Sequence, residues 1–180
     1  MLTLELRWFV PGAISDRELR SFADGGRIEA RVDQYLLGTG DDLGIKRRGA
    51  AGTIEHKRRL AHTPVHVARD GVPLAGVAER WRKDWPEHTP AGDWMPVEKR
   101  RALRRVGSCR AELTLLRLST PHLTLAVETA NVDALDELLR AAGSLLRSHP
   151  GLAATFEQGE SCGYPAWIGA RWASNPQPTG

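Results

Sequence analysis

The chain has 180 residues, 41% of them hydrophobic and 26% charged, and its net charge of +3 falls short of the positive excess expected of a protein that coats nucleic acid. Its two cysteines, Cys109 and Cys162, form no CxxC pair, and a small secreted scaffold would carry more of them. No leader pattern opens the chain and no apolar stretch reaches the roughly 20 residues that a membrane span needs, so we expect a cytoplasmic protein that contacts no membrane.

The first part of the chain predicts one helix and four strands of an antiparallel sheet. Leu2–Val10 alternates as a strand, and Ser15 begins a short helix, to about residue 23, through a Ser-x-x-Glu capping box. Three strands follow at residues 27–37, 43–48 and 53–60, separated by tight glycine-rich turns. Such spacing is typical of an antiparallel meander.

The middle segment, residues 62–96, is the hardest to assign because it holds several prolines. We expect a loop, a short helix near Ala78–Lys83 and a second loop, packed together as a cover over the sheet. Trp81, Trp85 and Trp94 lie there among basic residues. That arrangement leaves a surface for nucleic acid or another partner as the alternative.

The remainder predicts three more strands and one long helix, with strands at residues 97–106, 109–119 and 122–129. Apolar residues at helical spacing predict the helix from 132 to 146, capped by Asn131 or Asp133 and packed on the outside of the sheet. Ser161–Trp167 is expected only as a compact segment.

The predicted fold class is therefore α+β, with an antiparallel sheet of about seven to eight strands and a few flanking helices. We expect one domain over residues 1–172 and a flexible tail over residues 173–180.

Charged residues recur on one face of nearly every predicted strand, because residues two apart point the same way. The sets are Glu5 with Arg7, Arg31 with Asp33, Lys46 with Arg48, Glu55 with Lys57 and Arg59, and later Glu112 and Glu128. A solvent-facing side explains much of this pattern. A sheet of this size also tends to curl or close, and a charged face turned inward would line a tunnel. Its charges would then pair with one another, with metal or with a ligand.

Five segments, in their order along the chain, resemble the CYTH superfamily of triphosphate tunnel metalloenzymes. They are Glu-Leu-Arg-Trp-Phe-Val at residues 5–10, Asp33–Leu37, Leu43–Arg48, Ile54–Lys57 and Leu125–Glu128, the last of which leads into the predicted long helix. The resemblance implies an antiparallel barrel around a charged tunnel. The superfamily includes inorganic triphosphatases, thiamine triphosphatases and class IV adenylyl cyclases.

The resemblance also implies site residues of two kinds. The substrate-binding candidates are Arg7, Arg31, Lys46, Arg48, Lys57 and Arg59, and the candidate ligands of Mg²⁺ or Mn²⁺ are Glu5, Glu112 and Glu128. The chain departs from the family pattern at Arg7, where a second glutamate is expected, and at Ala130, which replaces the second glutamate of a Glu-x-Glu pair. Fewer carboxylates weaken a site for divalent metal.

Three functions are compatible with these residues. The first is a tunnel that binds a phosphate-rich small molecule, either a triphosphate or an organic polyphosphate, with metal-dependent hydrolysis as the enzymatic form of that function. The second is a non-catalytic ligand-binding or scaffold protein that has lost the metal site. RNA binding through the basic run Arg100–Arg105 is the third and is not favoured, and no catalytic residue is assigned.

Overall fold

The computed structural model describes residues 1–50, 52–68 and 73–174, except the side chains of residues 172–174. The strands are β1 (Leu2–Pro11), β2 (Arg27–Leu36), β3 (Leu43–Arg48), β4 (Thr53–Val67), β5 (Leu74–Asp84), β6 (Trp94–Val106), β7 (Cys109–Arg117), β8 (His122–Thr129) and β9 (Glu160–Ser161). The helices are α1 (Asp16–Ala23), α2 (Leu135–Ser148), α3 (Pro150–Phe156) and α4 (Tyr164–Ser174).

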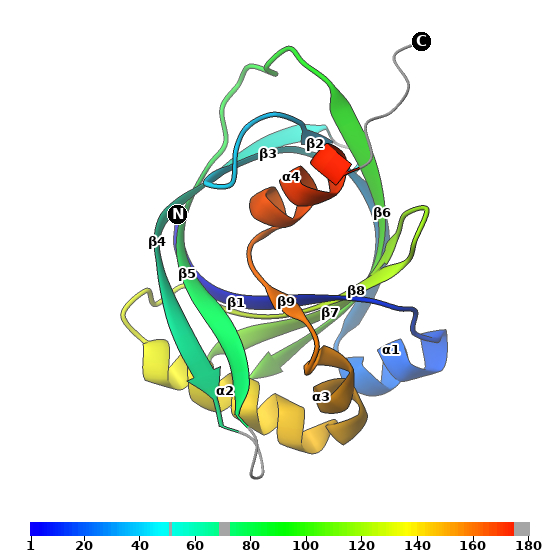
Figure 1. Cartoon of the computed structure of the whole chain (residues 1–180), viewed down its shortest axis with the longest axis vertical. Helices are drawn as coiled ribbons and strands as arrows, with labels where there is room; N and C mark the ends of the chain where they lie inside the picture. The colour runs from blue at the N-terminus through cyan, green and yellow to red at the C-terminus, as the bar shows by residue number, and fades with distance from the viewer. Residues whose placement is uncertain (51, 69–72, 175–180) are drawn as a thin grey trace.

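Within the described residues, eight strands close into an antiparallel barrel (Figure 1). The strand order is β5-β4-β3-β2-β6-β7-β8-β1, and β1 also pairs with β5, which closes the ring. The short β9 pairs with β1 at Trp8 and Phe9, beyond the stretch of β1 that pairs with β5. The predicted α+β class with an antiparallel barrel is confirmed.

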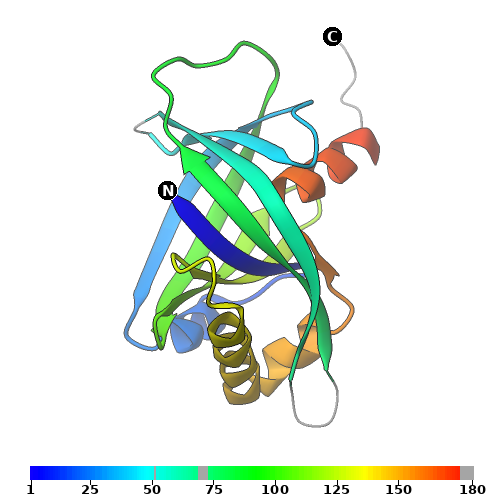
Figure 2. The same ribbon diagram turned by 90° about the vertical axis from the view of Figure 1, so that its left-hand side faces the viewer.

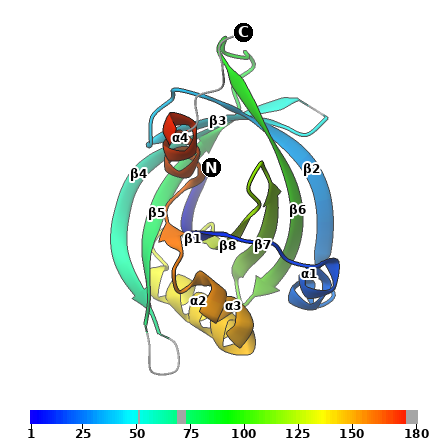
Figure 3. The same ribbon diagram turned by 45° about the vertical axis from the view of Figure 1, so that its right-hand side comes forward.

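The main apolar core lies outside this barrel, between its wall and the helices. On β1, Leu4, Leu6 and Trp8 point outward into that core, whereas Glu5 and Arg7 point into the barrel. The outward apolar residues of β7 and β8 join them, and α1, α2 and α3 cover this face (Figure 3). The alternation of side chains along each strand thus separates an apolar outer face of the barrel from a charged inner face.

The capping box predicted for α1 is present. The Ser15 side chain accepts a hydrogen bond from the Glu18 backbone N–H, and the Glu18 carboxylate accepts one from the Ser15 N–H. The cap predicted for α2 is wrong, because the N-cap residue is Ala134 and, among the described residues, its side chain makes no capping bond. Asn131 Oδ1 instead accepts from the Asp133 N–H, and Asp133 pairs with Arg80.

The prediction for the middle segment is also wrong. β4 continues to Val67, and the expected helix at Ala78–Lys83 is part of strand β5. A register shift between Arg59 and Ala61 reorients β4, and beyond this point β4 pairs with β5 alone. Pro64 is tolerated there because an edge strand loses no ladder bond on its open side. Figure 2 shows β4 and β5 running on past the barrel beside α2.

Trp81 therefore belongs to the barrel and does not cover it. It lies on β5, is fully buried and receives Lys57 Nζ over its ring at 4.5 Å. Trp85 follows the end of β5 and is half exposed.

The last part of the chain is more regular than its sequence pattern predicts. Ser161–Trp167 divides between the end of β9 and the start of α4, and α3 was not expected. Residues 173–174 end α4, and the rest of the predicted tail lies outside the described residues. None of the helices in the described parts of the chain is long and apolar enough to cross a membrane.

The position of the core outside the barrel generates a stability prediction. Leu138 of α2 is 0% exposed, so Leu138→Ala should lower the free energy of unfolding in urea by about 2–5 kcal/mol through a packing cavity. Leu60, which is 44% exposed, is the control, and Leu60→Ala should stay within about 0.5 kcal/mol of the wild type. Equal losses for the two variants would contradict the assignment of the core.

Candidate functional site

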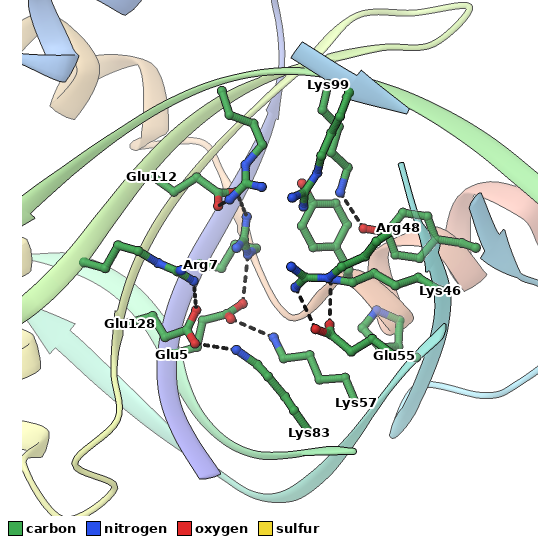
Figure 4. A pocket seen from close by; sticks show the side chains of 17 residues that line it. Glu5, Arg7, Lys46, Arg48, Glu55, Lys57, Lys83, Lys99, Glu112 and Glu128 are labelled. Atoms are coloured by element: carbon green, nitrogen blue, oxygen red, sulfur yellow. Dashed lines mark hydrogen bonds and ion pairs between the residues drawn. The ribbon is translucent and has the colours of Figure 1, made fainter. Parts of the chain in front are cut away.

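The inward side chains of the barrel form a charged pocket with about 50 Å³ of free space between them (Figure 4). Nearly every barrel strand contributes to it. The lining side chains are Glu5, Arg7, Arg31, Tyr35, Lys46, Arg48, Glu55, Lys57, Lys83, Lys99, Arg101, Arg110, Glu112, Glu128, Tyr164 and Pro165, together with the backbone at Gly44.

Each lining carboxylate is held between two cations. Lys57 Nζ lies 2.6 Å from Glu5 Oε2, and Arg7 Nε lies 2.9 Å from Glu5 Oε1. Glu55 is placed in the same way, with Lys46 Nζ at 2.7 Å from Oε1 and Arg48 at 2.6 Å from Oε2. Lys46 is directly opposite Glu55 on the neighbouring strand, Arg7 lies two residues from Glu5 on the same strand, and Lys57 reaches Glu5 past β5.

The other two lining carboxylates repeat this arrangement. Arg7 reaches Glu112 Oε1 at 3.3 Å, and Arg101 binds Glu112 Oε2. Glu128 is bound by Lys83 at one oxygen and by Arg110 at 2.7 Å at the other. Arg7 thus links Glu5 and Glu112 into one network.

Asp33 forms a similar cluster deeper in the wall. Its Oδ2 lies 3.0 Å from Arg31 and 3.2 Å from Lys99. Lys99 also donates to the Tyr35 hydroxyl and lies over the ring of Tyr164 at 3.9 Å. Asp33 and Lys99 are buried, so their charges depend on these partners.

Positive charge exceeds negative charge in the pocket. Among the described residues, nine cationic side chains and four carboxylates line it, a formal excess of five. Beside the pocket, Asp33 pairs with Lys99, and Glu29 pairs with Arg31 and Arg101. These two carboxylates lower the excess to three, and it is two if Lys99 is also counted as neutral.

Burial and neighbouring charges shift the pKa values of these groups. Burial opposes ionisation of Glu5 and Glu112, but the neighbouring cations outweigh it and hold the pKa of both carboxyls below the ordinary value. Burial lowers the pKa of Lys46 to about 8, with the Glu55 carboxylate opposing that change. Burial also lowers the pKa of Lys99 well below its ordinary value, even with Asp33 beside it.

The structure brings most of the predicted site residues together. Arg7, Arg31, Lys46, Arg48 and Lys57 line the pocket, and so do Glu5, Glu112 and Glu128. Arg59 is the exception, because it pairs with Glu79 at 2.8 Å and with Asp42 instead of lining the pocket.

The basic run Arg100–Arg105 does not form one surface. Arg101 points into the pocket, whereas Arg100 and Arg104 pair with Asp16 and Asp24 at the two ends of α1. Because successive side chains of β6 point to opposite faces of the sheet, the basic residues are divided between the pocket and the outer surface.

Within the described part of the chain, nine pocket residues were not among the predicted site residues: Tyr35, Gly44, Glu55, Lys83, Lys99, Arg101, Arg110, Tyr164 and Pro165. Alternation along the strands could have identified several of these residues. Glu55 was already placed on the charged face, and Arg110 lies two residues from the predicted Glu112. Lys99 and Arg101 lie two residues apart on β6 and share one face. Lys83 was hidden by the wrong helix assignment. No strand pattern points to Tyr164, which reaches the pocket from α4.

The carboxylates predicted to bind a metal ion are already paired with basic side chains. Every carboxylate oxygen of Glu5, Glu112 and Glu128 is engaged by a lysine or an arginine. Within the described residues, no group of three or more acidic, histidine or cysteine side chains is arranged to hold a metal ion. As arranged, these residues do not fit Mg²⁺ or Mn²⁺, which need free oxygen ligands, and the metal site stays a prediction.

A closed antiparallel barrel with a charge-lined interior is the architecture that the CYTH resemblance implies, and that expectation is confirmed. Among solved structures, the PH1012 protein of Pyrococcus horikoshii OT3 is similar over 80% of this chain and 89% of its own, with 12% identity and a TM-score of 0.45. The Pct1 RNA triphosphatase of S. pombe is similar over 87% of this chain and 84% of its own, with 13% identity and a TM-score of 0.45. No family model and no curated protein matches the chain.

The pairing of each carboxylate with two cations makes the tunnel sensitive to loss of a single acid. Glu112→Gln leaves Arg7 and Arg101 buried without their common partner, and should lower the free energy of unfolding by about 3–5 kcal/mol. Glu98→Gln, an exposed position on the same hairpin, is the control and should change it by less than about 0.5 kcal/mol in the same urea titration. An unaffected Glu112→Gln protein would contradict this interdependence of charges.

Proposed function

We propose that the tunnel binds a phosphate-rich anion, such as a triphosphate or an organic polyphosphate. The observation that carries this proposal is the excess of cations in a buried pocket, which internal ion pairs do not neutralise. Buried charge of one sign is costly unless a ligand of the opposite sign compensates it. A chain of phosphates, with several negative charges along a narrow line, meets this requirement.

The cations are also suited to phosphate in their chemistry. Within the described residues, the Nε atoms of Arg31, Arg48 and Arg101 have no hydrogen-bond partner, although these residues pair through their terminal nitrogens. Guanidinium groups offer a planar fork of donors that matches phosphate oxygens. A phosphate oxygen is an acceptor of the same kind as the carboxylates that these arginines hold already.

Binding in this proposal needs no divalent metal. The positive lining itself neutralises the phosphates, and a cation placed among these lysines and arginines would be repelled. The tunnel is thus a basic binding pocket, and hydrolysis is not part of the proposal.

The first test is calorimetric titration of tripolyphosphate into the protein in the presence of EDTA. We expect binding, and we expect Lys57→Gln to weaken it about ten- to hundredfold, since one charge-assisted hydrogen bond contributes about 1.5–3 kcal/mol. The matched control is Arg58→Gln, because Arg58 is the next residue on β4, is exposed and does not line the pocket. Its affinity should equal that of the wild type.

The outcomes separate the candidate functions. Absence of binding with and without Mg²⁺ would overturn the proposal and leave the scaffold alternative. Binding that appears only with added Mg²⁺ would contradict the metal-free mode and favour the predicted metal ligands Glu5, Glu112 and Glu128, and phosphate release would then be the assay to follow.

The lowered pKa of Lys46, about 8, adds a pH dependence. Above this pH the amine loses its proton and its attraction for phosphate, so affinity for tripolyphosphate should fall about tenfold between pH 7 and pH 9.5. Lys46→Arg keeps its charge throughout this range and should show a smaller decrease. Because ionisation of tripolyphosphate affects both proteins equally, parallel pH profiles for the two proteins would show that Lys46 is not the titrating group.

A further inference from the structure

One end of the barrel is filled by apolar side chains, although the rest of its interior is charged. Phe9, Val97 and Leu116 point inward there from three different strands and are buried. Trp167 and Ile168 of α4 pack among them, and the Trp167 ring stacks on Phe9 with 4.6 Å between centroids. Figures 1 and 3 show α4 lying across the opening of the barrel. A charged ligand is excluded from this end by packed hydrocarbon.

Tyr164, the first residue of α4, lies between this apolar filling and the charged pocket. Its ring stacks on Tyr35 with 5.5 Å between centroids and meets the edge of Phe9 at 5.2 Å. On the charged side, Lys99 Nζ lies 3.9 Å and Arg7 Cζ 4.6 Å from the centre of the ring. Tyr164 is therefore the floor of the pocket.

The hydroxyl of Tyr164 is a donor that the protein leaves free. Tyr164 is only 7% exposed, and in the described parts of the chain its hydroxyl has no hydrogen-bond partner. The charges that act on it are those of Arg7, Glu112 and Arg101, which place it beside the network of the pocket. Burial raises the pKa of Tyr164 above its ordinary value, so the group keeps its proton. A buried hydroxyl without a partner costs free energy, and a ligand oxygen would remove that cost.

The opposite end of the tunnel is open. Inward positions on β7 run from Leu116 at the filled end, through Glu112, to Arg110, whose side chain is 53% exposed. Arg48, whose side chain is 38% exposed, is also accessible from solvent. These arginines mark the entrance, and the exposure of the lining falls from there to the floor.

We propose that the tunnel is a pocket with a single entrance, which takes the free terminal phosphate of a phosphate chain and offers it the Tyr164 hydroxyl at the floor. This inference rests on the proposed function, and it narrows the ligand class to phosphate chains with at least one free end. A chain that carries a bulky organic group at both ends cannot place a phosphate at the floor, because α4 leaves no exit for the second group.

The test compares three probes by calorimetry: tripolyphosphate with two free ends, a nucleoside triphosphate with one, and a dinucleoside triphosphate with none. We expect the first two to bind and the third to bind at least about tenfold more weakly, since its charge is lower and its ends are blocked. Cyclic trimetaphosphate, which lacks free ends but carries no bulky group, separates the effect of missing ends from the effect of bulk and should also bind weakly. Equal affinity for the one-ended and the doubly capped probe would overturn the inference while leaving the proposed function intact. Absence of binding by all four probes would overturn both.

Tyr164→Phe tests the floor directly, because it keeps the stacked ring and removes only the hydroxyl. We expect affinity for tripolyphosphate to fall about two- to tenfold, with a melting temperature that is unchanged or raised because an unpartnered hydroxyl is removed. Thr3→Val is the matched control, since Thr3 also carries a buried hydroxyl without a partner in the described residues but does not line the pocket. A Tyr164→Phe protein that binds like Thr3→Val would overturn the role of the hydroxyl.

Discussion

The structure depends on the pairing of each carboxylate that lines the pocket with two cations. Closing the sheet turns its charged face inward, where water is scarce and a lone charge is costly. Glu5, Glu55, Glu112 and Glu128 each meet this constraint by accepting from two basic side chains, some on the same or a neighbouring strand and others one strand further away. The barrel therefore needs its charges in fixed places, and these are also the places where an anion would bind.

Because the interior of the barrel is charged, the main apolar core lies outside the barrel wall. Leu6 and Trp8 on β1 pack outward, and α2 and α3 cover them. As far as the described residues show, only one end of the barrel carries an apolar filling, which α4 completes with Trp167 and Ile168. The molecule is thus stabilised by packing on two sides of a charged space, and the position of α4 makes that space a pocket instead of an open channel.

Alternation along the strands was enough to predict much of the site. Glu5 with Arg7, and Lys46 with Arg48, were placed on one face by the period-two rule, and these residues do line the pocket. The rule gives the face of a residue and not its position along the barrel. Arg59 keeps the register of Lys57, yet it pairs with Glu79 and Asp42 and does not line the pocket.

The sequence by itself determined which side chains share a face, because that follows from strand geometry alone. It also indicated a barrel, through the charged face and the CYTH resemblance. Only the tertiary structure decided that this face turns inward, that each acid is already bound by two bases, and that Tyr164 closes one end. These facts depend on contacts between residues far apart in the chain, such as Arg7 with Glu112 and Lys83 with Glu128, and local periodicity carries no information about such distances.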